Sequence, residues 1–252
     1  PRSAGTLPAR SAGTCATGDG DVTDAVRKSF INTRSPNRVA MQHVMTGKVK
    51  EVYLVDDETL EFAYTDNISV FDKIIPSKIP HKGETLCRTA KHWFELLNAE
   101  GIRNHYIDEP APDRMRVKRV DIIRDYSRID GSTVGYLIPL EVICRHYVAG
   151  SLMDRIEAGR ITAAQLGFPE GHEVRYGEKL PRPFMECTTK LEDHDMQLTE
   201  AEAKEMAGLS DAEYAEMMDT VLRIDALIER EVAARGLIHC DGKKEFGYDE
   251  ER

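Results

Sequence analysis

The sequence predicts an α+β fold with two lobes. β-rich runs come first along the chain, helices and strands mix later, and regular strand–helix–strand alternation is missing. That order favours an α+β fold over a doubly wound parallel sheet, which requires such alternation. The 252 residues are 41% hydrophobic and 31% charged, enough to bury a substantial core. We expect the N-terminal lobe over about 41–120 and the second lobe over about 121–252.

Residues 1–40 predict a disordered extension, because they are rich in Ala, Gly, Ser, Thr, Pro and Arg and show no apolar period. The chain does not begin with methionine, so we expect the folded part to start near Met41 or Met45. The alternative is a transit peptide. Asp19 and Asp21 argue against it, since transit peptides contain few acids.

The first lobe is expected to contain a hairpin and a helix. Residues 48–55 and 60–65 are β-rich and are joined by a polar turn, which predicts the hairpin. Residues 83–101 predict an amphipathic helix that ends at Gly101. The apolar positions of this helix recur at helical spacing, at Leu86, Ala90, Trp93 and Leu97.

The second lobe is expected to mix strands and helices. β-rich runs cover 115–123 and 137–148, and a small-residue turn then precedes a helix at 152–159. The longest helix is expected over 210–235, where a serine precedes a glutamate by three residues and forms a capping box. Its apolar stripe comprises Tyr214, Met217, Val221, Ile224, Ile228 and Val232.

Composition excludes several classes of function. A net charge of −10 disfavours binding to nucleic acid or to an anionic membrane, because both require a basic surface. The longest apolar runs, such as Leu137–Ile143, are too short to span a bilayer. The five cysteines are far apart and odd in number, which indicates neither a disulfide framework nor a zinc cluster and favours a cytoplasmic location. They are Cys15, Cys87, Cys144, Cys187 and Cys240.

The first candidate site is the stretch from Gly47 to Tyr53. Lys48 and Lys50 alternate along an extended segment and therefore share one face, where two ammonium groups are able to clamp nucleotide phosphates. The alternative is an ordinary solvated strand edge, where lysines are common.

The second candidate is a proline-punctuated loop over Thr65–Glu84, which carries Asp66, Ser69 and Asp72. Polar loops between a hairpin and a helix often hold substrates. The alternative is turn chemistry, because Asp and Ser side chains favour turns by bonding their own backbone.

The third candidate is Glu141–Arg155, where a β-rich run reaches Arg145 and small residues precede Ser151. A helix start with small residues lets backbone amides approach an anion, so the arginine and the serine together suit a phosphate. The alternative is a surface ion pair plus a serine cap. We assign His146 no role.

The fourth candidate is Pro183–Asp195, in which a short strand gives way to a concentration of donors and acids. These residues are Glu186, Thr188, Lys190, Asp193, His194 and Asp195. The final acid–histidine–acid trio resembles a metal-ligand set, but the alternative of a solvated turn is more common.

The fifth candidate lies near the C-terminus. Asp241, Lys243 and Glu245 share one face of an expected strand. Carboxylates of this kind suit Mg²⁺, which keeps several waters and bridges to substrate phosphates. The alternative is a cross-strand charge ladder on an exposed hairpin.

Together these stretches resemble one family, SAICAR synthetase, over about Thr46–Tyr248. Their order is "GKVKEVY", "SVFD" with "IPHKGE", "EVICRHYVAGS", "ECTTKLEDHD" and "GLIHCDGKKEFG". Each motif is weak alone, whereas the ordered set is specific. The resemblance implies a catalytic domain over 41–252, with a β-rich N-terminal lobe and ATP in the cleft between two lobes.

The resemblance implies an ATP-dependent ligase of purine biosynthesis. It would join L-aspartate to the carboxylate of 5-amino-1-(5-phospho-D-ribosyl)imidazole-4-carboxylate through an acyl phosphate, with Mg²⁺ as cofactor. Such a reaction needs cations to hold a triphosphate, a phosphorylated nucleotide and two carboxylates. That need explains lysine clamps in an acidic protein.

The resemblance also implies roles for the matching residues. Gly47, Lys48 and Lys50 match the loop at the ATP phosphates, and Glu186 and Lys190 match the adenine and ribose side. The substrate-binding positions are Arg145, Ser151, Ser69 and Asp72. The catalytic positions are Asp241 and Lys243, and the metal-binding position is Glu245.

The chain departs from the family pattern at its end. The family continues past this strand to a second metal-binding acid and a phosphate-binding arginine, so we expect a C-terminal truncation after Arg252. Two alternatives therefore stay open: a nucleotide-binding module without turnover, and a different ATP-dependent ligase. The expected partners are small-molecule substrates, and a homo-oligomer is left open.

Overall fold

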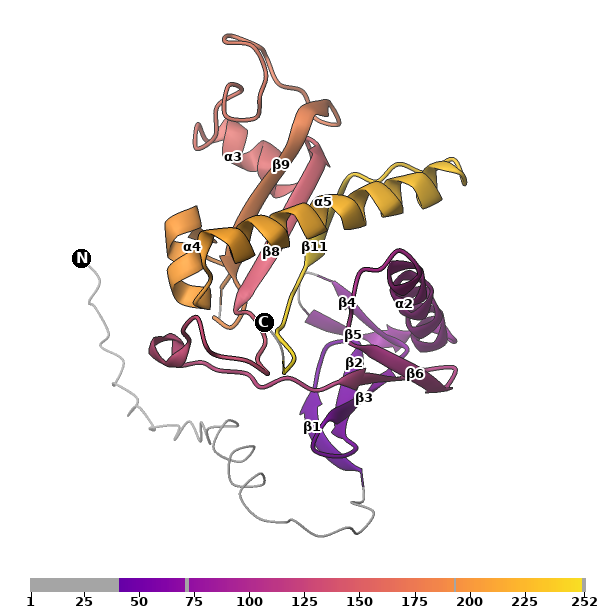
Figure 1. Ribbon diagram of the computed structural model, residues 1–252. Coiled ribbons are helices and arrows are strands. Elements are labelled where there is room, and N and C mark those ends of the chain that lie inside the picture. The colour runs from indigo at the N-terminus through magenta and orange to yellow at the C-terminus, as the bar shows by residue number, and fades with distance from the viewer. Residues whose placement is uncertain (1–40, 71–72, 193, 251–252) are drawn as a thin grey trace, which may run out of the picture. The chain divides into compact units, whose positions relative to one another are not determined.

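The computed structural model describes residues 41–70, 73–192 and 194–250 (Figure 1). The described residues all lie within one compact unit, Met41–Arg252. The predicted disordered extension lies outside them. Among the helices that the structure describes, none combines the length and the apolar character needed to cross a bilayer.

The first sheet has five antiparallel strands in the order β1-β2-β3-β7-β6. Its strands are β1 (Gln42–Thr46), β2 (Lys50–Leu54), β3 (Thr59–Tyr64), β6 (Tyr106–Ala111) and β7 (Arg114–Lys118). The predicted hairpin is confirmed, since Val52 of β2 pairs with Phe62 of β3. Val52 and Leu54 are buried because alternate residues of a strand face the core.

Helix α2 (Lys82–Ala99) packs against this sheet and confirms the predicted amphipathic helix. Cys87 of α2 is buried with Met115 and Val117 of β7. The helix ends as expected, because Gly101 adopts a left-handed φ of 74°. At the N-terminus of α2, the Gly83 amide donates a hydrogen bond of 3.0 Å to Asp66 Oδ1.

The segment expected as a loop over 65–84 contains a further hairpin. Strand β4 (Asn67–Val70) pairs antiparallel with β5 (Lys73–Lys78) in a two-stranded sheet. Each strand carries two β-branched residues, Ile68 and Val70 in β4 and Ile74 and Ile75 in β5, which favour the pairing. Pro76 is compatible with β5 because the strand has an unpaired edge.

The third sheet has four antiparallel strands in the order β10-β9-β8-β11. Its strands are β8 (Leu140–Tyr147), β9 (Lys179–Thr189), β10 (Gln197–Leu198) and β11 (Asp241–Lys244). β8 confirms the predicted run over 137–148, and α3 (Ser151–Glu157) confirms the helix expected at 152–159. β11 is the strand expected near the C-terminus.

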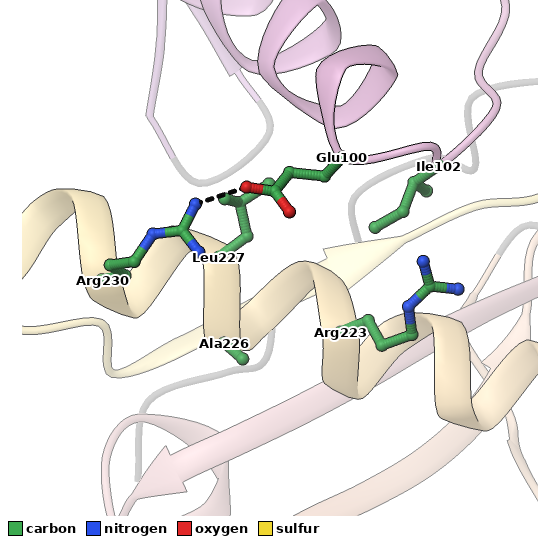
Figure 2. Close-up of a pocket in the computed structure, with 6 residues that line it drawn as sticks. All are labelled: Glu100, Ile102, Arg223, Ala226, Leu227 and Arg230. Atoms are coloured by element: carbon green, nitrogen blue, oxygen red, sulfur yellow. Dashed lines mark hydrogen bonds and ion pairs between the residues drawn. The ribbon is translucent and has the colours of Figure 1, made fainter.

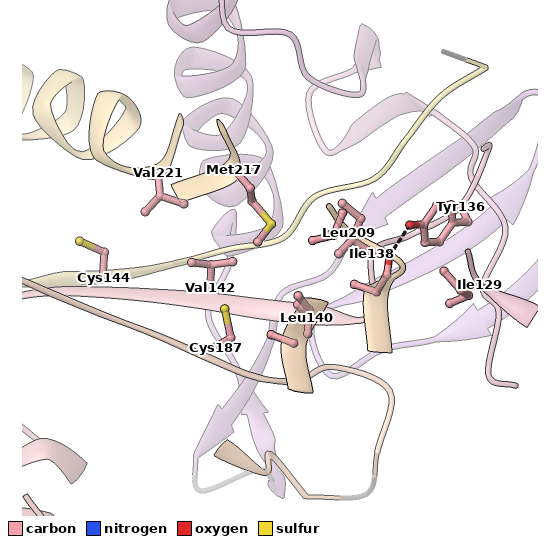
Figure 3. Close-up of a cluster of buried hydrophobic side chains, with 12 residues drawn as sticks. Ile129, Tyr136, Ile138, Leu140, Val142, Cys144, Cys187, Leu209, Met217 and Val221 are labelled. Atoms are coloured by element: carbon pink, nitrogen blue, oxygen red, sulfur yellow. Dashed lines mark hydrogen bonds between the residues drawn. The ribbon is translucent and has the colours of Figure 1, made fainter. Parts of the chain in front are cut away.

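Helix α5 (Asp211–Ala233) lies against β8 (Figure 1). It opens with the predicted capping box of Ser210 and Glu213. Figure 3 shows the core between this helix and the sheet, in which Val142 and Cys144 of β8 face Met217 and Val221 of α5.

The predicted stripe of α5 is largely correct, but Asp225 is an addition to it. The Asp225 side chain is 1% exposed, although its neighbours in the stripe are apolar. The residues of α5 that are buried are Met217, Val221, Ile224, Asp225 and Leu227. A buried acid in an apolar helix face requires partners, because an unpaired charge there would be costly.

Two further elements differ from expectation. The β-rich run over 115–123 leaves the sheet after Lys118, because the Asp121 amide bonds to Gly135 instead of to a neighbouring strand. Helix α4 (Glu200–Ala207) was not predicted, although Thr199 and Glu202 form a second capping box. A short 3-10 helix, η1, covers Tyr126–Arg128. Mixed sheets and helices in this order make the fold α+β, as predicted.

Candidate functional site

The third sheet has one polar face, which strand register creates. Asp241 of β11 pairs with Arg145 of β8, and Lys243 pairs with Ile143. On the other side of β8, Ile143 pairs with Glu186 of β9. Side chains of paired residues point to the same face, so these charged groups lie together. The opposite face, with Val142 and Cys144, packs against α5.

A row of side chains with alternating charge crosses this polar face. The Glu141 carboxylate, 9% exposed, accepts hydrogen bonds from Lys190 Nζ at 2.9 Å and Lys243 Nζ at 2.6 Å. Lys190 also lies 2.8 Å from Glu245 Oε1, and Lys243 lies 3.2 Å from Asp195 Oδ2. The five side chains therefore form one ionic network.

The network keeps both lysines charged. Burial lowers the pKa of Lys190, but hydrogen bonds to Glu245 and Glu141 outweigh burial and raise its pKa. The pKa of Lys243 is raised in the same way, by Glu141 and Asp195 against the effect of burial. Two ammonium groups are thus held as cations at neutral pH, which suits them to anionic ligands.

A second cluster surrounds Arg145, whose side chain is 9% exposed. Its guanidinium lies 3.4 Å from Asp241 Oδ2 and donates to Ser151 Oγ at 3.3 Å. Glu186 accepts two hydrogen bonds of 2.8 Å from Arg155, while Arg145 Nε lies 3.7 Å from Glu186. The arginine predicted as a substrate clamp is therefore oriented by two acids and a serine.

Lys50 of the first sheet interacts electrostatically with the same network. Its ammonium lies 4.2 Å from the centre of the Phe62 ring. Burial lowers the pKa of Lys50, Glu245 acts to raise it and Lys190 acts to lower it, so the three charges interact electrostatically. Lys48 is exposed on the turn before β2, where the Gly47 amide donates to Lys50 O at 2.8 Å.

Ser69 is a predicted site residue whose strand partner lies outside this network. Ser69 lies on β4, half-buried and paired with Ile74. Asp72 lies outside the described residues, as does Asp193 of the predicted trio. Asp66 from the same stretch has a structural contact, since it accepts a hydrogen bond from the Gly83 amide at the start of α2, although this amide lies 17 residues away and is not part of a local turn.

Sequence reasoning missed Glu141 and Arg155. Glu141 was visible as a charge that interrupts an apolar run, and its alternation with Arg145 along β8 would have placed both on one face. Arg155 had no such signal, because its partner Glu186 lies 31 residues away along the chain.

The pocket in Figure 2 lies away from this network. It has a volume of about 230 Å³ at the junction of α2 and α5, and an ion pair of 2.7 Å joins Arg230 to Glu100 at its edge. It is lined by Glu100, Ile102, Arg223, Ala226, Leu227 and Arg230. None of the predicted site residues lines it, so the polar face remains the candidate site.

Comparison with known proteins gives one consistent result. The sequence model of the SAICAR synthetase family matches residues 43–252. A phosphoribosylaminoimidazole-succinocarboxamide synthase of Thermoplasma acidophilum is 49% identical over 212 residues, which cover 84% of this chain and 70% of that protein.

Solved structures agree with the sequence match. A SAICAR synthetase in complex with ADP has a TM-score of 0.64 and 27% identity, covering 82% of this chain and 75% of that one. The SAICAR synthase of Saccharomyces cerevisiae complexed with SAICAR has a TM-score of 0.65 and 26% identity, covering 87% and 72%. The chain belongs to the SAICAR synthetase family.

Proposed function

We propose that this chain joins L-aspartate to the carboxylate of 5-amino-1-(5-phospho-D-ribosyl)imidazole-4-carboxylate, using ATP and giving SAICAR, ADP and phosphate in purine biosynthesis. The observation that carries this proposal is the charged face of β8, β9 and β11, in a member of the SAICAR synthetase family. Relatives of similar fold contain ADP in one case and SAICAR in another. The same ligand classes suit lysines and arginines held as cations.

Two buried atoms on that face support a ligand there. Arg145 Nε and Thr188 Oγ1 have no hydrogen-bond partner among the described residues. Thr188 pairs with Glu141, so both atoms belong to the polar face. Buried polar atoms normally find partners, and a bound substrate would supply them.

We propose that Gly47, Lys48 and Lys50 bind the ATP phosphates, and that Lys190, which the resemblance places at the adenine and ribose side, contacts the phosphates as well. Lys50 and Lys190 approach Glu245 from different sheets, which supports a phosphate site between their ammonium groups. Glu186 already accepts two hydrogen bonds from Arg155. Glu186 would therefore act on the ATP site mainly by orienting the Arg155 side chain.

The imidazole ribonucleotide is assigned to Arg145, Ser151 and the residues beside them on β11. An arginine oriented by Asp241 and Ser151 is suited to a phosphate or carboxylate, because its donors are fixed in direction. Ser69 and Asp72 remain predicted substrate contacts.

The chemistry assigns different tasks to Lys243 and Asp241. ATP converts the imidazole carboxylate to an acyl phosphate, the aspartate nitrogen attacks its carbon, and phosphate leaves. The raised pKa of Lys243 makes it a cation that stabilises developing negative charge, not a base. Asp241, whose side chain is 53% exposed, would accept the proton that the amine loses.

Glu245 fits the proposed Mg²⁺ site. Its side chain is 40% exposed and offers hard oxygen donors, and Mg²⁺ commonly binds one or two carboxylates plus substrate phosphates. When bound, Mg²⁺ would neutralise phosphate charge. This chain's own residues hold the carboxylate in place, because Lys190 contacts it at 2.8 Å.

We further propose a cytoplasmic location, with lobes over about 41–120 and 121–252. Cys87, Cys144, Cys187 and Cys240 are free thiols, which supports a reducing compartment. A homo-oligomer stays a prediction that sedimentation would check.

The test is ADP release by the purified chain with ATP, Mg²⁺, the imidazole carboxylate and aspartate. We expect sustained release over many turnovers only when all four are present, and equal sustained release without aspartate would refute the proposal. Lys243→Met should lower kcat by at least ten-fold. Lys179→Met is the matched control, because Lys179 is 63% exposed on β9. ATP binding by calorimetry without any product would instead support a nucleotide-binding module.

A further inference from the structure

A second cluster of ionisable side chains lies under α5, on the opposite face of β8 and β11 from the proposed active site. Asp225 of α5 is 1% exposed and contacts three basic side chains. His146 comes from β8, His239 from the segment before β11, and Lys244 from β11. The proposed ligase chemistry uses none of these residues.

The partners divide between the two oxygens of the carboxylate. His239 Nε2 lies 3.0 Å from Oδ1, and Lys244 Nζ also contacts Oδ1. His146 Nε2 lies 3.1 Å from the other oxygen, Oδ2, and Cys144 Sγ lies 3.8 Å from that same imidazole nitrogen. A thiol, an imidazole and a carboxylate oxygen therefore converge on one side of Asp225.

These three donor atoms have the spacing of a transition-metal site. The ligand atoms of Cys144, His146 and Asp225 all lie within 4.8 Å of one another. Zinc–ligand bonds are about 2.0–2.3 Å long, so tetrahedral ligand atoms are separated by roughly 3–4 Å. The observed 3.1 and 3.8 Å therefore require little rearrangement.

We propose that Cys144, His146 and Asp225 bind one zinc-class divalent ion, and that His239 and Lys244 hold the second carboxylate oxygen in place. Sulfur and nitrogen ligands favour a borderline-soft transition metal over Mg²⁺, which separates this site from Glu245. Residues that contact the second oxygen of a ligating carboxylate fix its orientation. Lys244 contacts Oδ1 of Asp225 in this way. A water completes the coordination.

Metal binding at this site releases one proton, which comes from the Cys144 thiol. Burial first, and then the neighbouring Asp225, raise the pKa of Cys144 to about 12, so the metal-free chain holds a thiol. The ion binds sulfur as the thiolate, and the thiol proton passes to solvent. His146 binds through Nε2 as the neutral tautomer that carries its proton on Nδ1. The bound group then contains a divalent cation, two anionic ligands and the Lys244 ammonium.

The site would connect elements that are distant in sequence. Cys144 and His146 are neighbours on β8, whereas Asp225 lies 79 residues beyond His146 on α5. Cysteine spacing alone indicates no zinc cluster because only one ligand is a cysteine and Asp225 comes from a separate element. A bound ion would cross-link α5 to β8 and stabilise the native state.

The test measures metal binding by the full chain, after chelator treatment, with Zn²⁺ or Co²⁺ alone. We expect one equivalent of Zn²⁺ by calorimetry, an increase in Tm, and a sulfur-to-cobalt charge-transfer absorption. Cys144→Ser should remove that absorption and weaken binding at least ten-fold. Cys187→Ser is the matched control, because Cys187 is also buried in this sheet but contacts Tyr214. Cys240→Ser controls for the exposed thiol.

Three results would overturn the proposal. They are the absence of saturable binding, equal affinity in the wild type and Cys144→Ser, and loss of the cobalt absorption in Cys240→Ser instead. Far-ultraviolet circular dichroism checks that each variant is folded before titration. None of these readouts depends on turnover, so failure here and failure of the proposed ligase activity are distinguishable.

Discussion

Replacing Glu141 by glutamine would remove the anion that joins Lys190 to Lys243. The buried carboxylate accepts hydrogen bonds of 2.9 and 2.6 Å from these lysines. A hydrogen bond to a charged group contributes about 1.5–3 kcal/mol. The contribution of Lys243 is smaller because its side chain is 50% exposed and solvent screens it. We therefore expect the free energy of unfolding to fall by about 2–3 kcal/mol.

The assay is thermal unfolding followed by circular dichroism. In a protein of this size 1 kcal/mol corresponds to about 2–4 °C, so Tm should fall by roughly 5–10 °C at pH 7. Burial raises the pKa of Glu141, but hydrogen bonds from Lys243 and Lys190 outweigh burial and lower its pKa. A lowered pKa stabilises the fold above the unfolded-state pKa, and this stabilisation is lost as pH falls through the folded-state pKa. The difference between wild type and Glu141→Gln should therefore shrink in acid.

The control is Glu95→Gln on α2. Glu95 is 55% exposed and its carboxylate lies 4.0 Å from Lys91, so we expect a change below about 0.5 kcal/mol. Equal Tm values for the two variants would refute the argument that Glu141 holds the lysines. A difference that grows in acid would refute the pKa argument.

Three further predictions concern binding and packing. Lys50→Met should weaken ATP binding at least ten-fold in calorimetry, because it removes an ammonium beside Glu245; unchanged affinity would remove Lys50 from the ATP site. Tyr136→Phe should cost about 1–1.5 kcal/mol in urea unfolding, since the buried Tyr136 hydroxyl donates to Ala207 O at 2.7 Å; an unchanged midpoint would contradict this. Gly83→Ala should cost about 1–3 kcal/mol, because its Cβ would lie 2.5 Å from Tyr64 O; wild-type stability would show that the backbone moves aside.

Local patterns predicted much of the fold and part of the site. Alternation placed Asp241 and Lys243 on one face of β11, and the structure shows both contacting the polar face. The capping box at Ser210 gave the start of α5, because its side-chain and backbone partners are only three residues apart. These features depend on neighbours in sequence, which is why they were predictable.

Features that depend on distant residues were not predictable. The burial of Asp225 follows from partners 79 and 14 residues away, His146 and His239. Glu141 similarly gains its role from Lys243, 102 residues further along the chain. The β4–β5 hairpin was missed for another reason, since its proline and polar residues resemble a loop when considered one at a time.

Adjacent lysines on β11 make its centre tolerant of a one-residue shift in pairing. After such a shift, Lys244 would take the position of Lys243, and a lysine would still face each side of the sheet. The ends of the strand distinguish the two alignments. Phe246 is partly buried against the hydrophobic core, and this shift would move it to the exposed position of Glu245. Correct pairing of this strand therefore depends in part on Phe246, so replacing Phe246 by a small residue would favour misaligned pairing during folding.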